Sequence, residues 1–383
     1  MAITENIADV VTIKVTGVGG GGNNVVSRMV ASGIEGIEFI NVNTDRPTLM
    51  SSGAQVKLQI GEKLTNGQGA GSDPKVGRAA AEEDRNNIAK LFENTDAVFV
   101  TAGMGGGTGT GAAPVVAEIA RESGALTIGV VTTPFRFEGA AKMRRAQEGI
   151  KELLEKVDTL FIIPNENIRA VSEQKVTFAN AFEIADSVLD QAVTGVAELL
   201  GKTGFINLDF ADLRTTMRSS GVAHLGVGEA SGQNKVEEAA AGAIYSKLMG
   251  TSVDGARRVV VNVTGSMDIS MEDVEKIVGK IQAAAHPDAN IIFGVDFDQE
   301  LVDAMRVIVI ATDFAPAEEK PVPRKAEPAP RREEPPAPPV EESFRFEEPA
   351  LFSEEPAPQP EPEQPAPKAN ERDWDAILKL FEK

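Results

Sequence analysis

The sequence predicts an α/β protein with two structured domains and a long extended tail. Strand-like apolar segments alternate with helix-like segments through the first half of the chain, which is typical of parallel βαβ units with right-handed crossovers. The second half has fewer helices and more strands, which indicates a separate α+β domain. Near residue 315 the composition changes abruptly to proline and glutamate, which predicts a region without a packed core.

The first domain is expected over residues 11–175. Its predicted strands are rich in β-branched residues, and glycine or asparagine follows several of them. These strands cover 11–17, 37–45, 96–102, 125–131 and 158–164. The predicted helices cover 23–33, 73–95, a segment that ends at Ser123, and 139–156. The alternation of the two patterns predicts a Rossmann-like parallel sheet with helices on its faces.

A long helical stretch over 176–201 separates the two domains. Its length predicts a spine between them, so 176–207 is interpreted as a connecting helix and loop. The second domain is expected over 208–314. Its predicted strands are HLGVGEA (224–230), ARRVVVNVTG (256–265), ANIIFGVDF (289–297) and MRVIVIATDF (305–314), with helices near 233–249 and 271–285.

Both ends of the chain are expected to lack a stable core. Residues 1–10 are interpreted as a flexible N-terminus, and 315–369 hold most of the chain's 22 prolines, which predicts a disordered Pro/Glu-rich linker. In the final segment, 370–383, four apolar residues recur at helical spacing: Trp374, Ile377, Leu378 and Phe381. This pattern favours a short segment that folds in a partner's groove. A frayed terminus without a partner is the alternative.

Charge and composition exclude several classes of function. The net charge of −20 argues against nonspecific nucleic-acid binding, which depends on neutralising phosphates. The chain has no cysteine, so disulfides and thiolate metal sites are excluded. His224 and His286 lie far apart in the sequence, and we expect neither to bind a metal or act as a base. No basic-then-apolar leader and no run of about 18 apolar residues is present, so membrane insertion is not expected.

Two glycine-rich loops each lie between a predicted strand and a predicted helix. They are TGVGGGGNN (16–24) and GMGGGTGTG (103–111). At such a turn the backbone N–H groups and the helix dipole favour an anion, and glycine lets the backbone approach phosphate oxygens closely. Thr108 and Thr110 add hydroxyl groups that could donate to phosphate or meet Mg²⁺ through water. Neither loop carries a lysine.

Other phosphate-binding patterns are weaker. Residues 17–22 match G-x-G-x-x-G, and Asp45 lies at about the distance of a ribose-binding acid, so a Rossmann-type oxidoreductase is an alternative. A run of four glycines satisfies that pattern easily, and it leaves the second loop unexplained. The GKT at 201–203 lacks the glycine that a P-loop requires and follows a long helix, so it is interpreted as a helix stop.

The second of the two glycine-rich loops and several other motifs resemble those of a known family. GGGTGTG (105–111) is similar to the signature loop of the tubulin superfamily. GVGGGGNN, NVNTD, NLDFADLRTTM (207–217) and GVAHLGVGEASG (221–232) resemble, in order and spacing, the bacterial cell-division GTPases of the FtsZ family. The resemblance covers about residues 10–314. It implies a domain that binds GTP or GDP with Mg²⁺ held through the phosphates.

The resemblance also implies which residues contact the nucleotide. They are Gly19, Gly20, Gly21, Gly22, Asn24, Asn43, Thr44, Asp45, Gly103, Met104, Gly105, Gly106, Gly107, Thr108, Gly109, Thr110, Gly111, Pro134, Glu138, Lys142, Asn165, Phe182 and Asp186. Glu138 matches the family's sugar-contacting glutamate. Lys142 stands where the family usually has arginine, with Arg144 and Arg145 just beyond, and the sequence leaves open which of the three contacts phosphate or ribose.

Phe182 and Asp186 lie four residues apart on the long helix and therefore share a face. By resemblance Phe182 stacks on the base. Asp186 could accept hydrogen bonds from guanine N1 and N2, which adenine cannot supply, so it would favour GTP over ATP. Without the resemblance, core packing would explain Phe182 and a solvated helix face would explain Asp186.

In the family, the segment NLDFADLRTTM inserts into the nucleotide site of the next subunit. The resemblance therefore assigns Asn207, Asp209 and Asp212 to the attacking water. Read without it, Asp209 caps a helix and Asp212 supports the first turn. The two halves of one active site would then lie on opposite ends of each monomer.

The resemblance implies a self-assembling cytoskeletal GTPase that polymerises head to tail and scaffolds bacterial division. It places the protein in the cytoplasm at the division site, beneath the membrane. Membrane-anchored adaptors would bind residues 370–383, although WDAILKLFEK lacks the Ile-Pro and basic cluster usual in the family. A GTP-binding switch that does not polymerise is the second alternative.

Overall fold

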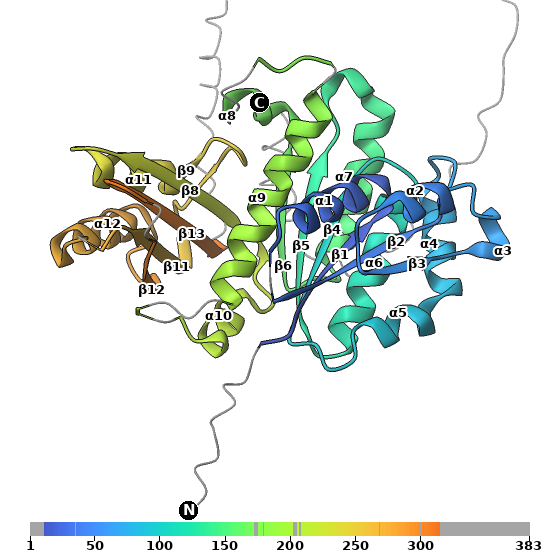
Figure 1. Cartoon of the computed structure of the whole chain (residues 1–383), viewed down its shortest axis with the longest axis horizontal. Coiled ribbons are helices and arrows are strands. Elements are labelled where there is room, and N and C mark those ends of the chain that lie inside the picture. Colours follow the sequence, from blue (N-terminus) through green and yellow to red (C-terminus); the bar gives the residue numbers. More distant parts are fainter. Residues whose placement is uncertain are drawn as a thin grey trace, which may run out of the picture. The chain divides into compact units, whose positions relative to one another are not determined.

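The computed structural model describes residues 11–34, 36–171, 175–178, 180–201, 205–206, 208–267, 269–298 and 301–314. Several expectations lie outside these residues. They concern the N-terminus 1–10, Lys202 and Thr203 of the GKT segment, Asn207, the linker 315–369 and the tail 370–383. The described chain contains two main sheets (Figure 1).

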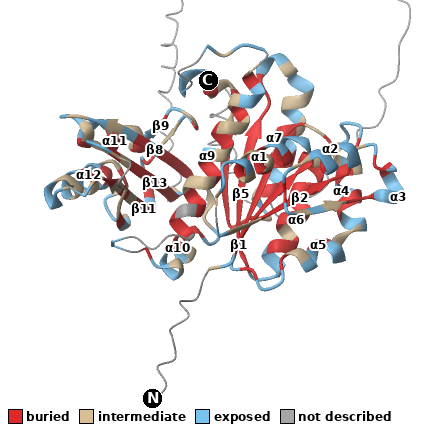
Figure 2. Cartoon of the chain, viewed as in Figure 1, coloured by how far each residue is buried: buried red, intermediate tan, exposed pale blue. Residues whose placement is uncertain are grey.

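The larger sheet has seven strands in the order β3-β2-β1-β4-β5-β6-β7, and every neighbouring pair is parallel. Its strands are β1 (Ile13–Val18), β2 (Ile37–Asn43), β3 (Val56–Gln59), β4 (Ala97–Gly103), β5 (Leu126–Thr133), β6 (Thr159–Pro164) and β7 (Gly221–Val222). All residues of β1 and β5 are buried, because helices cover both faces of the sheet (Figure 2). This confirms the predicted parallel α/β domain.

The helices of this domain follow the strands in sequence. They are α1 (Gly19–Ala31), α2 (Arg46–Ser51), α3 (Glu62–Thr65), α4 (Pro74–Glu83), α5 (Arg85–Leu91), α6 (Thr108–Glu122), α7 (Ala140–Leu154) and α8 (Ile168–Val171), with 3₁₀ turns at Arg136–Glu138 and Asn165–Asn167. The single helix predicted over 73–95 is two helices. They divide at Asp84, whose carboxylate accepts hydrogen bonds from Gly61 N and Asn87 Nδ2.

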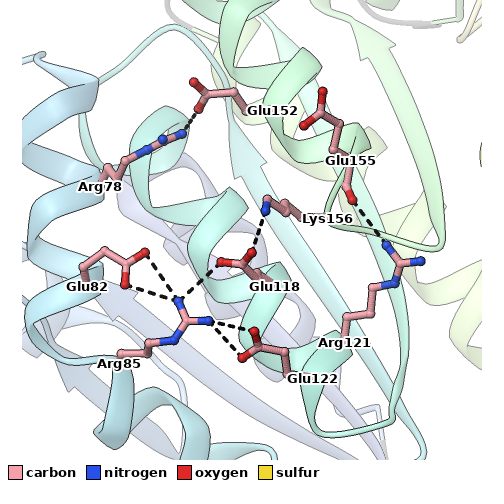
Figure 3. Close-up of polar contacts among 9 residues, drawn as sticks. All are labelled: Arg78, Glu82, Arg85, Glu118, Arg121, Glu122, Glu152, Glu155 and Lys156. Atoms are coloured by element: carbon pink, nitrogen blue, oxygen red, sulfur yellow. Dashed lines mark hydrogen bonds and ion pairs between the residues drawn. The ribbon is translucent and has the colours of Figure 1, made fainter. Parts of the chain in front are cut away.

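Charged side chains tie α5, α6 and the end of α7 together on the outer surface (Figure 3). Arg85 Nη1 lies 3.3 Å from Glu118 Oε2, and Arg85 Nη2 lies 2.9 Å from Glu122 Oε2. The other Glu118 oxygen accepts from Lys156 Nζ at 2.5 Å. The Lys156 hydrogen bond and charge lower the pKa of Glu118. This network ties α5 and the end of α7 to α6, the helix that follows the second glycine loop.

Helix α9 (Ala181–Gly201) is the predicted spine. It begins later than expected, because Asn180 Oδ1 accepts from both Thr177 N and Thr177 Oγ1 in the preceding turn. Its residues Val193 and Val196 are fully buried, in a core shared with α1, β1 and strands of the smaller sheet. The described part of the helix runs to Gly201, and residues 202–204, where the sequence predicts a stop, lie outside the described residues.

The smaller sheet has four strands in the order β12-β11-β13-β8. Its strands are β8 (His224–Ser231), β11 (Ala256–Gly265), β12 (Asn290–Phe297) and β13 (Ala304–Phe314), packed on α11 (Lys235–Ile244) and α12 (Met271–Ala284). A short hairpin joins β9 (Tyr245–Ser246) to β10 (Thr251–Ser252). Helix α10 (Phe210–Met217) and β7 precede this sheet in sequence, and β7 completes the larger sheet instead.

His224 is a buried structural residue. Its Nε2 donates to Ala243 O at 3.2 Å, so its Nδ1 accepts from Thr251 Oγ1 at 2.8 Å. Burial lowers the pKa of His224 to about 4.

Within the described residues no cluster of three potential metal-binding side chains occurs, and no helix has the length and apolar character needed to cross a membrane.

Candidate functional site

The two glycine loops meet at the centre of the larger sheet. In the strand order, β1 and β4 are neighbours from which the sheet continues in opposite directions. Ligands of such sheets bind outside the carboxyl ends of the strands at this switch point. The loops that follow β1 and β4 lie at that point, and a Cβ added to Gly19 would lie 2.7 Å from Gly109 N. The sheet topology therefore brings the two predicted phosphate loops into contact.

Both loops open helices whose first N–H groups are available to a ligand. The N-cap residues Val18 of α1 and Gly107 of α6 make no side-chain capping hydrogen bond. The first N–H groups of a helix have no acceptor within the helix. Together with the helix dipole, they favour an anion between the two helix starts.

In the first loop the glycines have two different roles. Gly19 has a φ of +72°, and a Cβ on Gly22 would lie 2.3 Å from Thr101 O, so both are needed for backbone packing. Gly20 and Gly21 are exposed, and a Cβ on Gly20 would meet nothing within 4 Å. Gly20 therefore faces open space that a ligand could fill.

The second loop is divided in the same way. Gly105 has a φ of +102°, and a Cβ there would lie 2.8 Å from both Lys142 Cγ and Pro134 Cγ. Gly106 faces open space. Cβ atoms on three further glycines would clash with protein: Gly107 with Ala70, Gly109 with Gly103 O, and Gly111 with Pro74 O at 1.9 Å. The amide of Gly111 also donates to Gly107 O within the first turn of α6. Because its Cβ would meet Pro74 O at the start of α4, packing against α4 explains this glycine without a ligand.

The remaining residues of this loop differ in their access to the crevice. Gly103 and Thr108 are partly exposed, whereas Met104 is buried and its amide donates to Thr132 O. The Thr108 hydroxyl lies 2.7 Å from Thr44 Oγ1. Thr110 is buried, and its hydroxyl accepts from Gly105 N at 2.8 Å. Of the two threonines, Thr108 is therefore placed for a ligand and Thr110 shapes the loop.

A buried asparagine network supports the first loop, and its central member, Asn23, is not among the site residues predicted from the sequence. Asn23 Nδ2 donates to Gly17 O at 2.9 Å, and Asn23 Oδ1 accepts from Asn43 Nδ2 at 2.8 Å. Asn41 Nδ2 donates to Asn23 O at 3.4 Å. Asn43 thus acts inside the protein, holding the loop to β2. The sequence feature that could have pointed to Asn23 is the pair of asparagines at the end of the loop.

Asp45 has a structural role in the described chain. Its Oδ1 accepts from Thr48 N at 2.8 Å, which makes it the N-cap of α2. This bond accounts for the residue without a ribose. Its position beside the Thr44–Thr108 contact still places it at the rim of the crevice.

Glu138 and Lys142 form an ion pair next to Gly105, with Glu138 Oε2 bonded to Lys142 Nζ. Glu138 Oε1 also accepts from Phe135 N at 2.9 Å. Arg145 points to another loop, where its Nη1 donates to Ser72 O at 2.7 Å, and Arg144 is exposed. Of these basic residues, Lys142 has a side chain that lies against Gly105 of the second glycine loop.

Asn165 follows β6 at the same edge of the sheet. It is 6% exposed, and its Oδ1 has no hydrogen-bond partner among the described residues. A buried acceptor without a partner costs about 1–3 kcal/mol. This residue is therefore suited to accept a hydrogen bond from a ligand that enters the crevice.

Aromatic and acidic residues on α9 complete the crevice. Phe182 is 48% exposed and meets Phe135 edge to face at 5.5 Å, so it is held in place with one side open. Asp186 is hydrogen-bonded to Asn24 and close to Arg28 on α1. Burial raises the pKa of Asp186 to about 6 despite these two partners. A carboxylate held in this way gains from hydrogen-bond donors on a ligand.

Asp209 and Asp212 lie at the opposite edge of the sheet. Arg214, on the same helix α10, donates to Gly124 O at 2.7 Å, and Gly124 lies just before β5 begins. The chain after α10 bonds to Asp158, just before β6 begins. The glycine loops follow the strand ends. In Figure 1, α10 accordingly lies at the bottom of the view.

The two carboxylates are exposed, and Asp209 makes no side-chain bond to the helix that follows it. The capping role that the sequence would otherwise suggest for Asp209 is therefore wrong for its side chain. Asp212 does lie in the first turn of α10. Two exposed carboxylates with no partner in the helix are available to a group outside this molecule.

Comparisons with known proteins agree with this geometry. Residues 12–173 match the tubulin/FtsZ family, GTPase domain, and residues 221–315 match the FtsZ family, C-terminal domain. The chain is similar to an empty FtsZ dimer from M. jannaschii, with 41% identity and a TM-score of 0.74 over 79% of this chain and 88% of that chain.

Two CetZ structures from Haloferax volcanii share the fold. CetZ2, solved as a protofilament bound to GTPγS, has 20% identity and a TM-score of 0.67 over 79% of this chain and 93% of that chain. CetZ1, solved as a GDP-bound monomer, has 20% identity and a TM-score of 0.66 over 78% and 93% of the two chains. These matches support the arrangement of the two sheets and α9.

Proposed function

This chain belongs to the tubulin/FtsZ family of GTPases, and we propose that it polymerises head to tail and hydrolyses GTP where two subunits meet. A single observation carries the proposal: the two glycine loops and the exposed carboxylates of Asp209 and Asp212 lie at opposite edges of one parallel sheet. Strand β5 has 8 residues, so the sheet is about 26 Å deep at about 3.3 Å per residue. Groups that share one water must lie within about 3 Å of it.

The crevice supplies a site for a guanine nucleotide. The open backbone at Gly20 and Gly106, with the Thr108 hydroxyl, would hold the phosphates. Phe182 would stack on the base, and Asp186 would accept from guanine N1 and N2. Adenine lacks both donors, so ATP would leave the partly buried Asp186 carboxylate without the hydrogen bonds that guanine supplies, which would disfavour ATP.

The sugar would lie between the glycine loops that hold the phosphates and the α9 residues that contact the base. Glu138 and Lys142 stand next to Gly105, and the unpartnered Asn165 Oδ1 faces the same edge of the sheet. If Lys142 turned toward the phosphates, its ammonium group would give up part of its ion pair with Glu138. We therefore expect the position of Lys142 to depend on the charge of the bound nucleotide. On this basis we propose Lys142, in preference to Arg144 or Arg145, as the cationic contact to the nucleotide.

Magnesium would reach the site with the phosphates. The two glycine loops contain no acidic side chain, so the ion would be held by phosphate oxygens and by Thr108 through water. When bound, it would neutralise charge that develops on the transferred phosphoryl group. The chain's own contribution is to fix the phosphates and exclude alternative orientations.

Asp209 and Asp212 of the next subunit would complete the site. Their carboxylates would orient a water for in-line attack on the γ-phosphorus, with the bond to the β-phosphate oxygen breaking and the water's proton passing to a carboxylate or solvent. Asn207, which lies outside the described residues, would help position the same water. Because each end of a subunit carries a different half, the contact is heterologous and builds an open filament.

Filaments of this kind would serve as the cytoskeletal scaffold of bacterial division, beneath the membrane. The FtsZ relative is a dimer and the CetZ2 relative is a protofilament, which supports self-association here. We propose that residues 370–383 bind a membrane-anchored adaptor. The linker 315–369 would give that tail a stretched reach of roughly 170 Å at the polyproline rise.

The direct test is GTP turnover per subunit against protein concentration, with pelleting measured on the same samples. We expect almost no turnover below a threshold concentration and a steep rise above it, together with pelleting. A switch that does not polymerise would show constant turnover per subunit. An oxidoreductase would bind NAD or FAD and ignore GTP.

A further inference from the structure

The last turn of α10 is held by side chains from both sheets. Arg258 Nη1, on β11, donates to Thr215 O at 3.1 Å and to Thr216 O at 3.5 Å. Thr312 Oγ1, on β13, donates to Thr216 O at 3.1 Å. From the larger sheet, the Thr159 hydroxyl donates to Met217 O. These bonds satisfy carbonyl groups that a helix end otherwise leaves without partners.

Arg258 and Thr312 form a pair matched to a helix end. They lie directly opposite each other across the antiparallel strands β11 and β13, so their side chains share a face. The carboxyl end of a helix carries partial negative charge, which favours a cation there. Arg258 Nε also donates to Asp313 Oδ2 at 3.2 Å, so its guanidinium is held from two directions.

At the other end of α10 the preceding chain is held by backbone pairing, because Ile206 and Val295 of β12 exchange hydrogen bonds at 3.0 and 3.1 Å, whereas the first turn itself has no side-chain cap. Asp209 makes no side-chain capping bond, and both Asp209 and Asp212 are exposed. Leu213 and Met217 are fully buried and fix one face of the helix. The tilt of the helix, and so the position of its first turn, therefore depends on the bonds at its last turn, on the Arg214 bond to Gly124 O and on the pairing of Ile206 with Val295 before Asp209.

We propose that Arg258 and Thr312 are positioning residues for hydrolysis, which clamp the last turn of α10 so that Asp212 meets the neighbouring subunit's nucleotide correctly. This inference rests on the proposed function, since it needs Asp212 to act on another subunit. Helix α10 has 8 residues and is about 12 Å long, so a tilt of about 5° moves its far end by about 1 Å. A displacement of that size costs up to about 100-fold in rate.

Three variants separate the clamp from general damage to the fold. Arg258→Gln removes the cation and most of its donors, and Thr312→Val removes only a hydroxyl, whereas Thr312→Ser keeps it. We expect the first two to lower kcat about 10-fold with unchanged KM for GTP and unchanged pelleting, and Thr312→Ser to retain wild-type kcat. Arg257→Gln, at the exposed neighbouring position on β11, is the control and should leave kcat unchanged.

A directional mixing experiment tests the role itself. Arg258→Gln protein preloaded with labelled GTP is mixed with excess wild-type protein, and the first turnover of label is recorded. Wild-type subunits then contribute their α10 to most labelled sites, so the label should be hydrolysed at the wild-type rate. In the reverse mixture, labelled wild-type protein in excess variant should react about 10-fold more slowly.

Equal rates in the two mixtures, fast or slow, would overturn the clamp. Slow hydrolysis in both would place the damage in the nucleotide site or the fold. The proposed function has its own control in the same series, because labelled wild-type protein diluted alone should not react. If it reacts at full rate alone, hydrolysis within one subunit is established and the proposed function fails whatever the variant does.

Discussion

The two edges of the larger sheet are built in opposite ways. At the strand ends, the glycine loops pack backbone against backbone, and buried asparagines such as Asn23 fix them from below. At the strand starts, α10 presents exposed carboxylates and is held by side chains that reach its last carbonyl groups. The first edge is shaped to receive an anion, whereas the second is shaped to offer one. The difference explains why one subunit would lack half of a catalyst.

The largest expected effect comes from removing a carboxylate at the second edge. Asp212→Ala should lower GTP turnover by roughly 100-fold or more, the range for a group that handles the attacking water. GTP binding and pelleting should be retained, because Asp212 is exposed and remote from the crevice. Asp288→Ala, another exposed acidic position, is the matched control. Unchanged turnover in Asp212→Ala would remove the carboxylate from the mechanism.

The first edge should respond through affinity. Gly106→Ala places a methyl group in open space that the phosphates would occupy, so the fold should tolerate it while GTP affinity falls about 10-fold, a loss of about 1.4 kcal/mol. Equilibrium binding of a fluorescent GTP analogue measures the change. Gly279→Ala in α12 also points into open space, far from either edge, and should bind normally. Equal affinity in the two variants would mean that Gly106 does not face the nucleotide.

Sequence patterns predicted the first edge better than the second. Consecutive glycines after a buried strand indicate close backbone contact, so the two loops could be predicted from the sequence, whereas their meeting point depends on the strand order. The division of roles within them could not be predicted, because Gly106 and Gly111 look alike until their surroundings are known. Similarly, Asn23 as a support depends on a hydrogen bond to Asn43, 20 positions away. The cap at Asp45, by contrast, is a local bond to Thr48 N.

At the second edge the sequence offered only NLDFADLRTTM, and its helix-cap reading failed for the Asp209 side chain. The residues that hold α10 come from β11 and β13, more than 40 positions away, so no local pattern marks them. The short segments α2, β3 and α3 were also absent from the prediction. Short elements carry little periodicity, and tertiary packing decides them.

The pH dependence of GTP binding gives a smaller, graded test. The pKa of Asp186 is about 6, and only the charged carboxylate can accept from both guanine donors. Affinity should therefore fall as the pH drops through 6, by roughly 10-fold between pH 7 and pH 5. Asp186→Asn should bind more weakly and lose this dependence. An identical pH profile in the variant would show that another group titrates.

The same carboxyl group should affect stability in the nucleotide-free protein. Its folded pKa lies above the unfolded value of 3.8, so its contribution is favourable at low pH and is lost as the pH rises through about 6. The buried His224 acts oppositely, because its folded pKa of about 4 lies below 6.5 and stability falls as the pH falls between these values. Asp186→Asn removes the titration of Asp186 and keeps that of His224. The difference in free energy of unfolding between variant and wild type, measured against pH, should therefore report the Asp186 contribution alone.

The smallest expected effect is on the surface network that supports the second loop. Arg85→Gln removes ion pairs to Glu118 and Glu122, which are partly exposed, so we expect a loss of about 1 kcal/mol or less. That corresponds to a fall in Tm of about 2 °C. At about 1 M salt the Tm values of variant and wild type should converge, because the charges are screened. GTP affinity should stay unchanged.

The most direct test of catalysis between subunits is complementation between two defective proteins. Asp212→Ala keeps the first edge, and the double variant Gly20→Ala/Gly106→Ala keeps the second edge while blocking the nucleotide. Each alone should be nearly inactive at GTP concentrations that saturate only the wild-type site. Mixing them should restore GTP hydrolysis, because nucleotide on one protein meets Asp212 of the other. A mixture as inactive as its components would contradict the account.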